Sequence, residues 1–170
     1  MIILIAGATH TGKTFLAQKL MERYKIPYYS IDHIKMGLIR SGQTKLSVCD
    51  DEKLTPYLWA IVKEIIKTAV ENNQSLILEG CYIPFDWKKD FDETYLNEIK
   101  YVCLVMSQSY VENNFSDILK FENVIERRLA HCACLKEELL KENERNLQLC
   151  KNYNLSYILI DGSYEVEFEI

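Results

Sequence analysis

Residues 7–14 read GATHTGKT and follow directly on an apolar run, IILIA, at residues 2–6. The eight residues match G-x-x-x-x-G-K-[ST], the pattern of a phosphate-binding P-loop. The next residues, 13–24, place Leu16, Leu20 and Met21 at helical spacing. A strand, a glycine-rich loop and a helix in that order are the surroundings that the pattern requires. The N-terminal part of the chain is therefore predicted to bind a nucleotide.

Each residue type in this loop has a mechanical reason. Gly7 and Gly12 let the backbone fold back, so that successive N–H groups point at phosphate oxygens. Lys13 supplies a positive charge for the β- and γ-phosphates, and the Thr14 hydroxyl can ligate Mg²⁺. The helix that begins at Lys13 also directs its positive dipole end at the phosphates. The predicted nucleotide contacts here are Gly7, His10, Thr11, Gly12, Lys13, Thr14 and Phe15.

Five apolar runs are predicted to be strands, and they lie at residues 1–6, 27–31, 75–79, 101–106 and 156–160. Their apolar content is mostly continuous, which is typical of parallel strands covered on both faces. Two of the intervening stretches, residues 58–70 and about 135–150, show helical periodicity. The sequence thus predicts a single three-layer α/β/α domain over residues 1–170, with a five-stranded parallel sheet.

Composition and charge narrow the possible partners and location. The net charge of -5 argues against a broad nucleic-acid surface, and no apolar run is long enough to cross a membrane. The N-terminus lacks the basic flank of a secretory signal, so we expect a cytoplasmic protein whose six cysteines stay reduced. The segment HCAC at residues 131–134 is a weak candidate for a metal site, since its spacing is not the usual C-x-x-C.

The N-terminal P-loop, the short length and the polar YSID end of the second apolar run together resemble the small P-loop kinases. This group includes adenylate-kinase-like, shikimate- and gluconate-kinase-like, chloramphenicol-phosphotransferase-like and zeta-toxin-like enzymes. The resemblance spans nearly the whole chain as an order of elements, but only the P-loop is specific by sequence. It implies the P-loop NTPase fold with strand order 2-3-1-4-5, ATP and Mg²⁺ as cofactors, and a lid at about residues 107–135.

Asp32 is predicted to close the second strand, at the edge of the sheet where ligands bind in open α/β folds. In kinases that accept small hydroxylated substrates, an Asp at the matching place orients or deprotonates the attacking hydroxyl. The resemblance therefore implies that Asp32 is a catalytic and acceptor-binding residue. The alternative is that Asp32 only caps the helix that follows.

Glu79 ends the third strand, where a carboxylate can hold Mg²⁺ directly or through water. The zeta-toxin-like kinases also carry a Glu-Gly pair at this strand end, and Gly80 follows Glu79 here. A buried glutamate without partners is costly, so we expect Glu79 to bind the metal or the acceptor. A purely structural hydrogen bond is the alternative.

Arginines are expected to neutralise the charge that builds up on the transferred phosphoryl group. Arg127 and Arg128 resemble the arginines of the lid-entry helix in small kinases, although adjacent helical residues point about 100° apart. A solvated role for both is the alternative. The same resemblance implies an acceptor contact from Arg40 and a base contact from Asp161.

The sequence therefore predicts an enzyme, a Mg²⁺-ATP-dependent kinase that phosphorylates a small-molecule acceptor. A nucleoside monophosphate kinase is one alternative, and it would need a phosphate clamp on the acceptor side. A non-catalytic ATP-binding regulatory module is the other, because binding and transfer are separable. Neither the identity of the acceptor nor the oligomeric state follows from the sequence.

Overall fold

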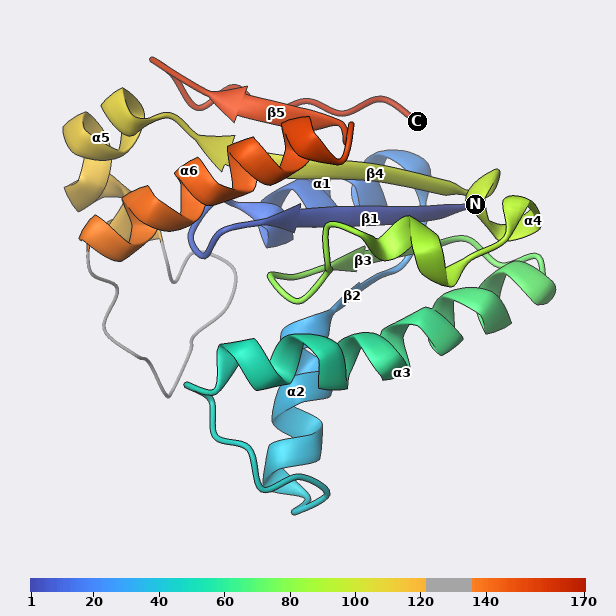
Figure 1. Ribbon diagram of the computed structural model, residues 1–170. Helices are drawn as coiled ribbons and strands as arrows, with labels where there is room; N and C mark the ends of the chain where they lie inside the picture. The colour runs from blue at the N-terminus through green and yellow to red at the C-terminus, as the bar shows by residue number, and fades with distance from the viewer. Residues whose placement is uncertain (122–135) are drawn as a thin grey trace.

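The computed structural model describes residues 1–121 and 136–170. Five parallel strands form one sheet in the order β2-β3-β1-β4-β5, flanked by helices on both faces (Figure 1). The strands are β1 (Ile2–Gly7), β2 (Tyr28–Ser30), β3 (Leu76–Glu79), β4 (Ile99–Met106) and β5 (Tyr157–Ile160). The helices are α1 (Lys13–Tyr24), α2 (Ile31–Arg40), α3 (Asp51–Glu71), the 3-10 turn η1 (Trp87–Asp90), α4 (Glu93–Leu96), α5 (Gln108–Lys120) and α6 (Lys136–Asn152). The predicted fold class and strand order are confirmed.

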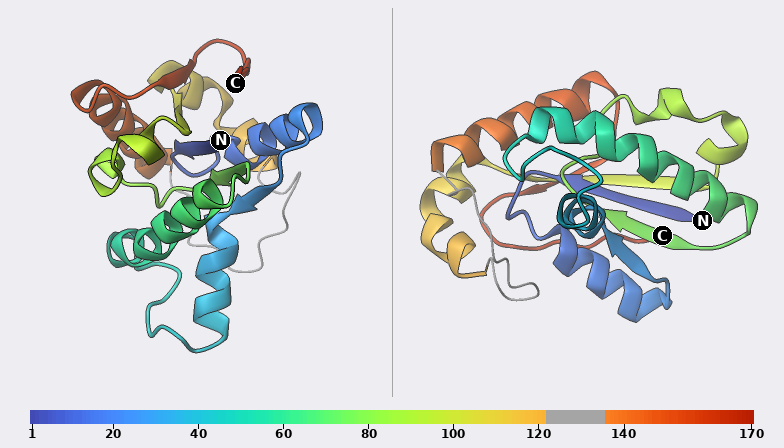
Figure 2. Two further views of the ribbon diagram at one scale, coloured as in Figure 1. Left: turned by 90° about the vertical axis from the view of Figure 1, so that its right-hand side faces the viewer. Right: turned by 90° about the horizontal axis from the view of Figure 1, so that it is seen from below.

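Strand β1 occupies the centre of the sheet and organises both cores. Its alternating residues Ile2 and Leu4 face the cluster that contains α3 and the C-terminal part of α6, whereas Ile3 and Ile5 face α1 and α5. All four are fully buried, which explains why the strand reads as a continuous apolar run. Figure 2 shows the helices on either side of the sheet.

The carboxyl ends of the strands meet at one edge of the sheet, on the left in Figure 1. The loop of residues 7–14 leaves β1 at this edge, and Glu79 is register partner to Ile5 of β1 and to Ser30 of β2. In an open parallel sheet this is the edge at which ligands bind. The fold therefore brings the ends of β1, β2 and β3 together around the predicted phosphate loop.

The first part of the predicted lid is an ordered helix. The polar stretch after β4 forms α5, whose N-cap is Ser107, and its buried residues Val111 and Ile118 join the core on the α1 side of the sheet. Helix α6 is fixed to β4 by Asn143, which accepts a hydrogen bond from the Met106 N–H at 2.7 Å. The rest of the predicted lid, residues 122–135, lies outside the described residues.

The cysteines only partly follow the prediction that all of them stay reduced. Cys81, Cys103 and Cys150 are free thiols. Cys49 is disulfide-bonded, so the prediction is wrong at that position. The HCAC segment lies outside the described residues, and the described part of the chain contains no group of three or more potential metal ligands of the His, Cys, Asp and Glu types.

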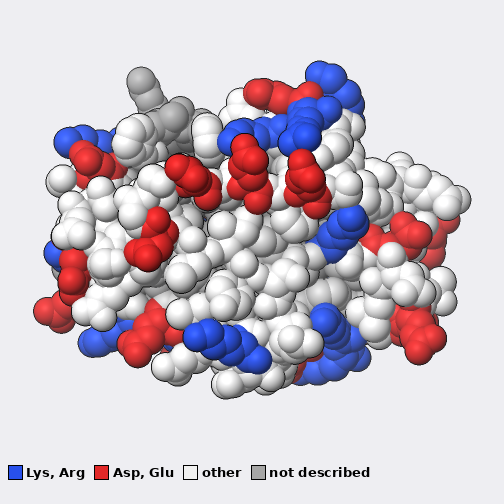
Figure 3. Space-filling model, turned by 90° about the horizontal axis from the view of Figure 1, so that it is seen from above, with Lys and Arg blue, Asp and Glu red and all other residues white. Residues whose placement is uncertain are grey.

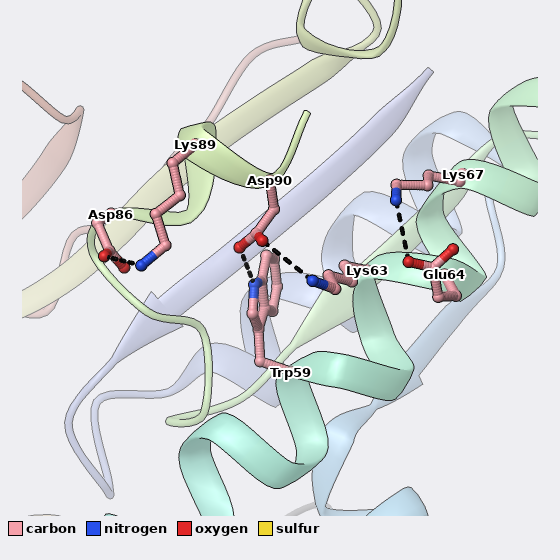
Figure 4. Close-up of polar contacts among 7 residues, drawn as sticks. All are labelled: Trp59, Lys63, Glu64, Lys67, Asp86, Lys89 and Asp90. Atoms are coloured by element: carbon pink, nitrogen blue, oxygen red, sulfur yellow. Dashed lines mark hydrogen bonds and ion pairs between the residues drawn. The ribbon is translucent and has the colours of Figure 1, made fainter. Parts of the chain in front are cut away.

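A partly buried polar contact ties η1 to α3 (Figure 4). The Asp90 carboxylate accepts a hydrogen bond from Trp59 Nε1 at 2.8 Å and pairs with Lys63 Nζ at 3.0 Å. The hydrogen bond from Trp59, followed by the bond and charge of Lys63, lowers the pKa of Asp90 below its usual value. By contrast, the Glu64–Lys67 pair in the same figure lies on the exposed side of α3.

Replacing Asp90 by alanine is expected to lower the free energy of unfolding by about 2 kcal/mol, because the buried Trp59 N–H loses its acceptor. The matched variant Glu64→Ala removes an exposed pair and is expected to change it by less than about 0.5 kcal/mol. Because the folded-state pKa of Asp90 is depressed, its contribution is present above the unfolded pKa and is lost as the pH falls. Denaturant unfolding at pH 7 and pH 3 measures this loss. If Asp90→Ala lowered the free energy of unfolding equally at both pH values, the ionised Asp90 carboxylate would not be the stabilising group.

The surface carries both charge signs. On the face shown in Figure 3, acidic and basic side chains are interspersed, and the basic ones do not gather into one stripe. Within the described ranges, none of the helices combines the length and the apolar content that crossing a membrane requires.

Candidate active site

The loop between β1 and α1 adopts a backbone that requires glycine at two positions. Gly7 and Gly12 have positive φ values of 144° and 83°, in the region that other residues rarely adopt. A Cβ on Gly7 would lie 2.5 Å from the Leu104 carbonyl oxygen, and one on Gly12 would lie 1.8 Å from Tyr164 Oη. The two glycines of the motif are thus explained by conformation and by close approach together.

Two donors hold the inside of this loop. Lys13 is buried and its Nζ donates to the Ala8 carbonyl oxygen at 2.6 Å, and the fully buried Thr11 hydroxyl donates to the same oxygen at 2.9 Å. The N-cap of α1 is Gly12, which has no side chain to occupy the N–H groups of the first helical turn. The loop and the helix N-terminus therefore form an arrangement that can accept an anion.

The side chains of Thr14 and Glu79 meet beside this loop. Thr14 Oγ1 donates to Glu79 Oε1 at 3.2 Å, and the Glu79 side chain is buried. The neighbouring Ser30 Oγ is also buried and has no hydrogen-bond partner within the described part of the chain. Since Ser30 and Glu79 are register partners, their side chains leave the sheet on the same face. A hydroxyl, a carboxylate and an unpartnered hydroxyl are oxygen ligands that fit Mg²⁺ and its waters.

Asp32 lies two residues beyond the end of β2, not at the end of the strand as the sequence predicted. Strand β2 ends at Ser30, and Asp32 is in the first turn of α2, so the prediction that it closes the strand is wrong. The reason is that helical backbone begins at Ile31, directly after the N-cap residue Ser30. Asp32 is therefore not the N-cap residue either. Its carboxylate forms an ion pair with Lys35, three residues further along the helix.

A short polar chain fixes Lys35 beside Asp32. Lys35 Nζ donates to Tyr82 Oη at 2.9 Å and lies 4.9 Å from the centre of the Tyr82 ring. Tyr82 Oη in turn donates to Asp51 Oδ1, at the start of α3, at 2.7 Å. Burial and the nearby carboxylates raise the pKa of Tyr82, so its hydroxyl stays protonated. This series of hydrogen bonds connects three segments near Asp32: α2, the segment that follows β3, and α3. Only the tertiary fold reveals it.

Cys81 follows the Glu79-Gly80 pair and lies close to Lys13. Burial raises the pKa of the Cys81 thiol, while the positive charge of Lys13 opposes this effect. The thiol therefore stays protonated near neutral pH. Gly80 is required here because a Cβ on it would lie 2.9 Å from Ile31 Cβ, at the start of α2.

The structure does not bring Arg40 to the phosphate loop. Arg40 is the last residue of α2 and is exposed, and α2 points away from the sheet in Figure 1. It follows Asp32 by eight residues, which is about 12 Å along the helix axis. Arg127 and Arg128 lie outside the described residues.

Asp161 is used in a structural contact. Its Oδ1 accepts hydrogen bonds from the hydroxyls of Ser107 and Ser109 at 2.6 and 2.9 Å, and these bonds lower its pKa. Phe15, by contrast, is an exposed aromatic residue beside the loop, with its ring centre 6.4 Å from that of Tyr164. Tyr164 was missed from the sequence because nothing local connects it to residues 7–14.

Comparison with solved structures finds proteins of similar fold. A protein from Chloroflexus aurantiacus J-10-fl, proposed to be a kinase, is 22% identical, with a TM-score of 0.55 over 85% of this chain and 78% of that one. A shikimate kinase from Bacteroides thetaiotaomicron is 13% identical, with a TM-score of 0.49 over 95% and 85% of the two chains. A gluconokinase from Sinorhizobium meliloti is 14% identical, with a TM-score of 0.44 over 89% and 94%.

The chain has the fold of the small P-loop kinases, as its sequence predicts. At these identities the likeness is one of fold, and the chemistry has to be argued from the site itself. No protein-family model and no curated protein matches the sequence.

Proposed function

We propose that this protein is a Mg²⁺-ATP-dependent kinase that transfers the γ-phosphoryl group to a hydroxyl of a small-molecule acceptor in the cytoplasm. The observation that supports the proposal is that three groups of residues lie at the same edge of the sheet. These are the phosphate loop with Lys13, the Thr14–Glu79 pair, and the Asp32–Lys35 pair. Donor binding, metal binding and acceptor activation each have a candidate group there.

In this proposal Lys13 and the loop N–H groups bind the β- and γ-phosphates and neutralise charge as it develops. Thr14 and Glu79 would hold Mg²⁺, which would offset the negative charge of the phosphates. Asp32 accepts the proton of the acceptor hydroxyl while the new O–P bond forms and the bond from the γ-phosphorus to the β-phosphate bridging oxygen breaks. Lys35 is a positioning residue that holds the Asp32 carboxylate through their ion pair.

The first alternative, a nucleoside monophosphate kinase, needs a cationic clamp for a second phosphate. Arg40 is exposed at the C-terminal end of α2, and Lys35 Nζ already contacts Asp32 and Tyr82. These contacts favour an acceptor without a phosphate group. Arg127 and Arg128 lie outside the described residues and stay candidates for contacting the transferred phosphoryl group from the lid.

The second alternative, an ATP-binding regulatory module, makes a different kinetic prediction. A kinase sequesters the γ-phosphate from water, so its ADP release should depend on the acceptor. ADP release with Mg²⁺-ATP can be measured across sugars, hydroxy acids, nucleosides, nucleoside monophosphates and aminoglycoside- or phenicol-like alcohols. Strong stimulation by one class supports a kinase and identifies that class. Slow release that ignores every compound would favour the regulatory module.

A further inference from the structure

The segment after β5 returns to the phosphate loop. The chain turns at Gly162, whose φ is 74°, and Asp161 holds this turn through the hydroxyls of Ser107 and Ser109. Tyr164 then lies against the loop, and Val166 is buried with Leu16 and Leu20 of α1 in one core cluster. The C-terminal segment is thus anchored on both sides of Tyr164.

Tyr164 contacts the peptide unit between Thr11 and Gly12. Its hydroxyl donates to the Thr11 carbonyl oxygen at 3.1 Å, and a Cβ on Gly12 would lie 1.8 Å from that hydroxyl oxygen. Burial raises the pKa of Tyr164 to about 12, so the hydroxyl remains a donor throughout the neutral range. The contact joins residues that are 153 positions apart in the chain.

The orientation of that peptide unit matters for anion binding. No described peptide bond is cis, so the Gly12 N–H points in the direction opposite to the Thr11 carbonyl. A peptide unit that turns its N–H group toward phosphate therefore turns its carbonyl to the opposite side, where a donor can hold it. For the Thr11 carbonyl, Tyr164 supplies that donor.

We propose that Tyr164 is a positioning residue for nucleotide binding: its hydroxyl fixes the Thr11–Gly12 peptide unit so that the Gly12 N–H faces the phosphates. The inference rests on the proposed function, since it needs a nucleotide in the loop. It makes the C-terminal segment part of the nucleotide site, although none of the P-loop sequence pattern extends there. The ring is 37% exposed and forms an edge contact with Phe15, so the hydroxyl can be removed without opening the core.

The test is the dissociation constant of MgADP, measured by calorimetry for the wild type and for Tyr164→Phe. Loss of the hydroxyl is expected to weaken binding about three- to tenfold, with a small decrease in the midpoint of thermal unfolding from the lost hydrogen bond. The matched control is Tyr157→Phe. That tyrosine is 38% exposed and makes no side-chain hydrogen bond within the described ranges, so its loss should leave binding unchanged.

The outcomes separate this inference from the proposed function. If the wild type does not bind MgADP, the proposed function is wrong. If the wild type binds and Tyr164→Phe binds equally well, the positioning role of Tyr164 is overturned.

A second measurement tests the contact without nucleotide. Gly12→Ala should lower the midpoint of thermal unfolding less in a Tyr164→Ala background than in the wild type, because the clash with the hydroxyl is gone. Part of the decrease in the midpoint is expected in both backgrounds, since φ at Gly12 is positive and alanine rarely adopts such a conformation. If Gly12→Ala lowered the midpoint equally in the two backgrounds, Tyr164 would not be in close contact with Gly12, and the inference would be wrong.

Discussion

Replacing Lys13 by methionine is expected to lower acceptor-dependent phosphoryl transfer at least about 100-fold. Methionine keeps most of the buried volume of the lysine stem but removes the charge and the hydrogen bond to the Ala8 carbonyl. The loss should appear mainly in kcat, because charge on the γ-phosphoryl oxygens is greatest in the transition state. The measurement is steady-state ADP formation with the most effective compound of the acceptor panel.

The control for this variant is Lys151→Met, in the last turn of α6 and exposed. Helix α6 ends where β5 begins, at the edge of the sheet opposite the phosphate loop. The Lys151→Met variant should have the same activity as the wild type. Wild-type activity in Lys13→Met would mean that phosphate transfer, if it occurs, uses another site.

Asp32→Asn is expected to lower kcat about 100- to 10,000-fold, because the amide cannot accept the proton of the acceptor hydroxyl. The dissociation constant of MgADP should change little, since the proposed role of Asp32 is on the acceptor side. Acceptor-dependent ADP formation and MgADP calorimetry on the same preparation measure the two effects separately. Unchanged turnover would exclude Asp32 as the base.

Glu64→Gln is the matched control for Asp32→Asn. Glu64 pairs with a lysine three residues along the same helix, as Asp32 does, but it lies on the exposed side of α3. Neutralising it should leave both kcat and the MgADP dissociation constant at wild-type values. A comparable loss in this variant would show that the effect of Asp32→Asn is a general effect of removing a helical ion pair.

The sheet could be predicted from sequence because its strands carry their own signal. Strand β1 is buried on both faces and is therefore apolar at consecutive positions, and the phosphate loop follows it in one unbroken stretch. Helix α3 was also visible, since Leu58, Val62 and Ile66 face one core at helical spacing. The strand order came from resemblance to small kinases, because local sequence does not encode which strands pair.

The parts that sequence could not supply are contacts between distant segments. Tyr164 reaches Thr11 and Asp51 reaches Tyr82 only after the chain has folded. The placement of Asp32 failed for a different reason: an acid after an apolar run signals a strand end or a first helical turn equally well. The acceptor contact of Arg40 came from the resemblance to small kinases, which does not fix the direction of α2; in the structure the end of α2 lies away from the loop.

The most direct test of the central claim is ³¹P NMR of wild-type protein with Mg²⁺-ATP and the compound that most stimulates ADP release. Transfer to that compound predicts a new phosphate-ester resonance that grows in step with ADP and is missing with Lys13→Met. ADP accompanied only by inorganic phosphate would contradict the claim, because the phosphoryl group would then have gone to water.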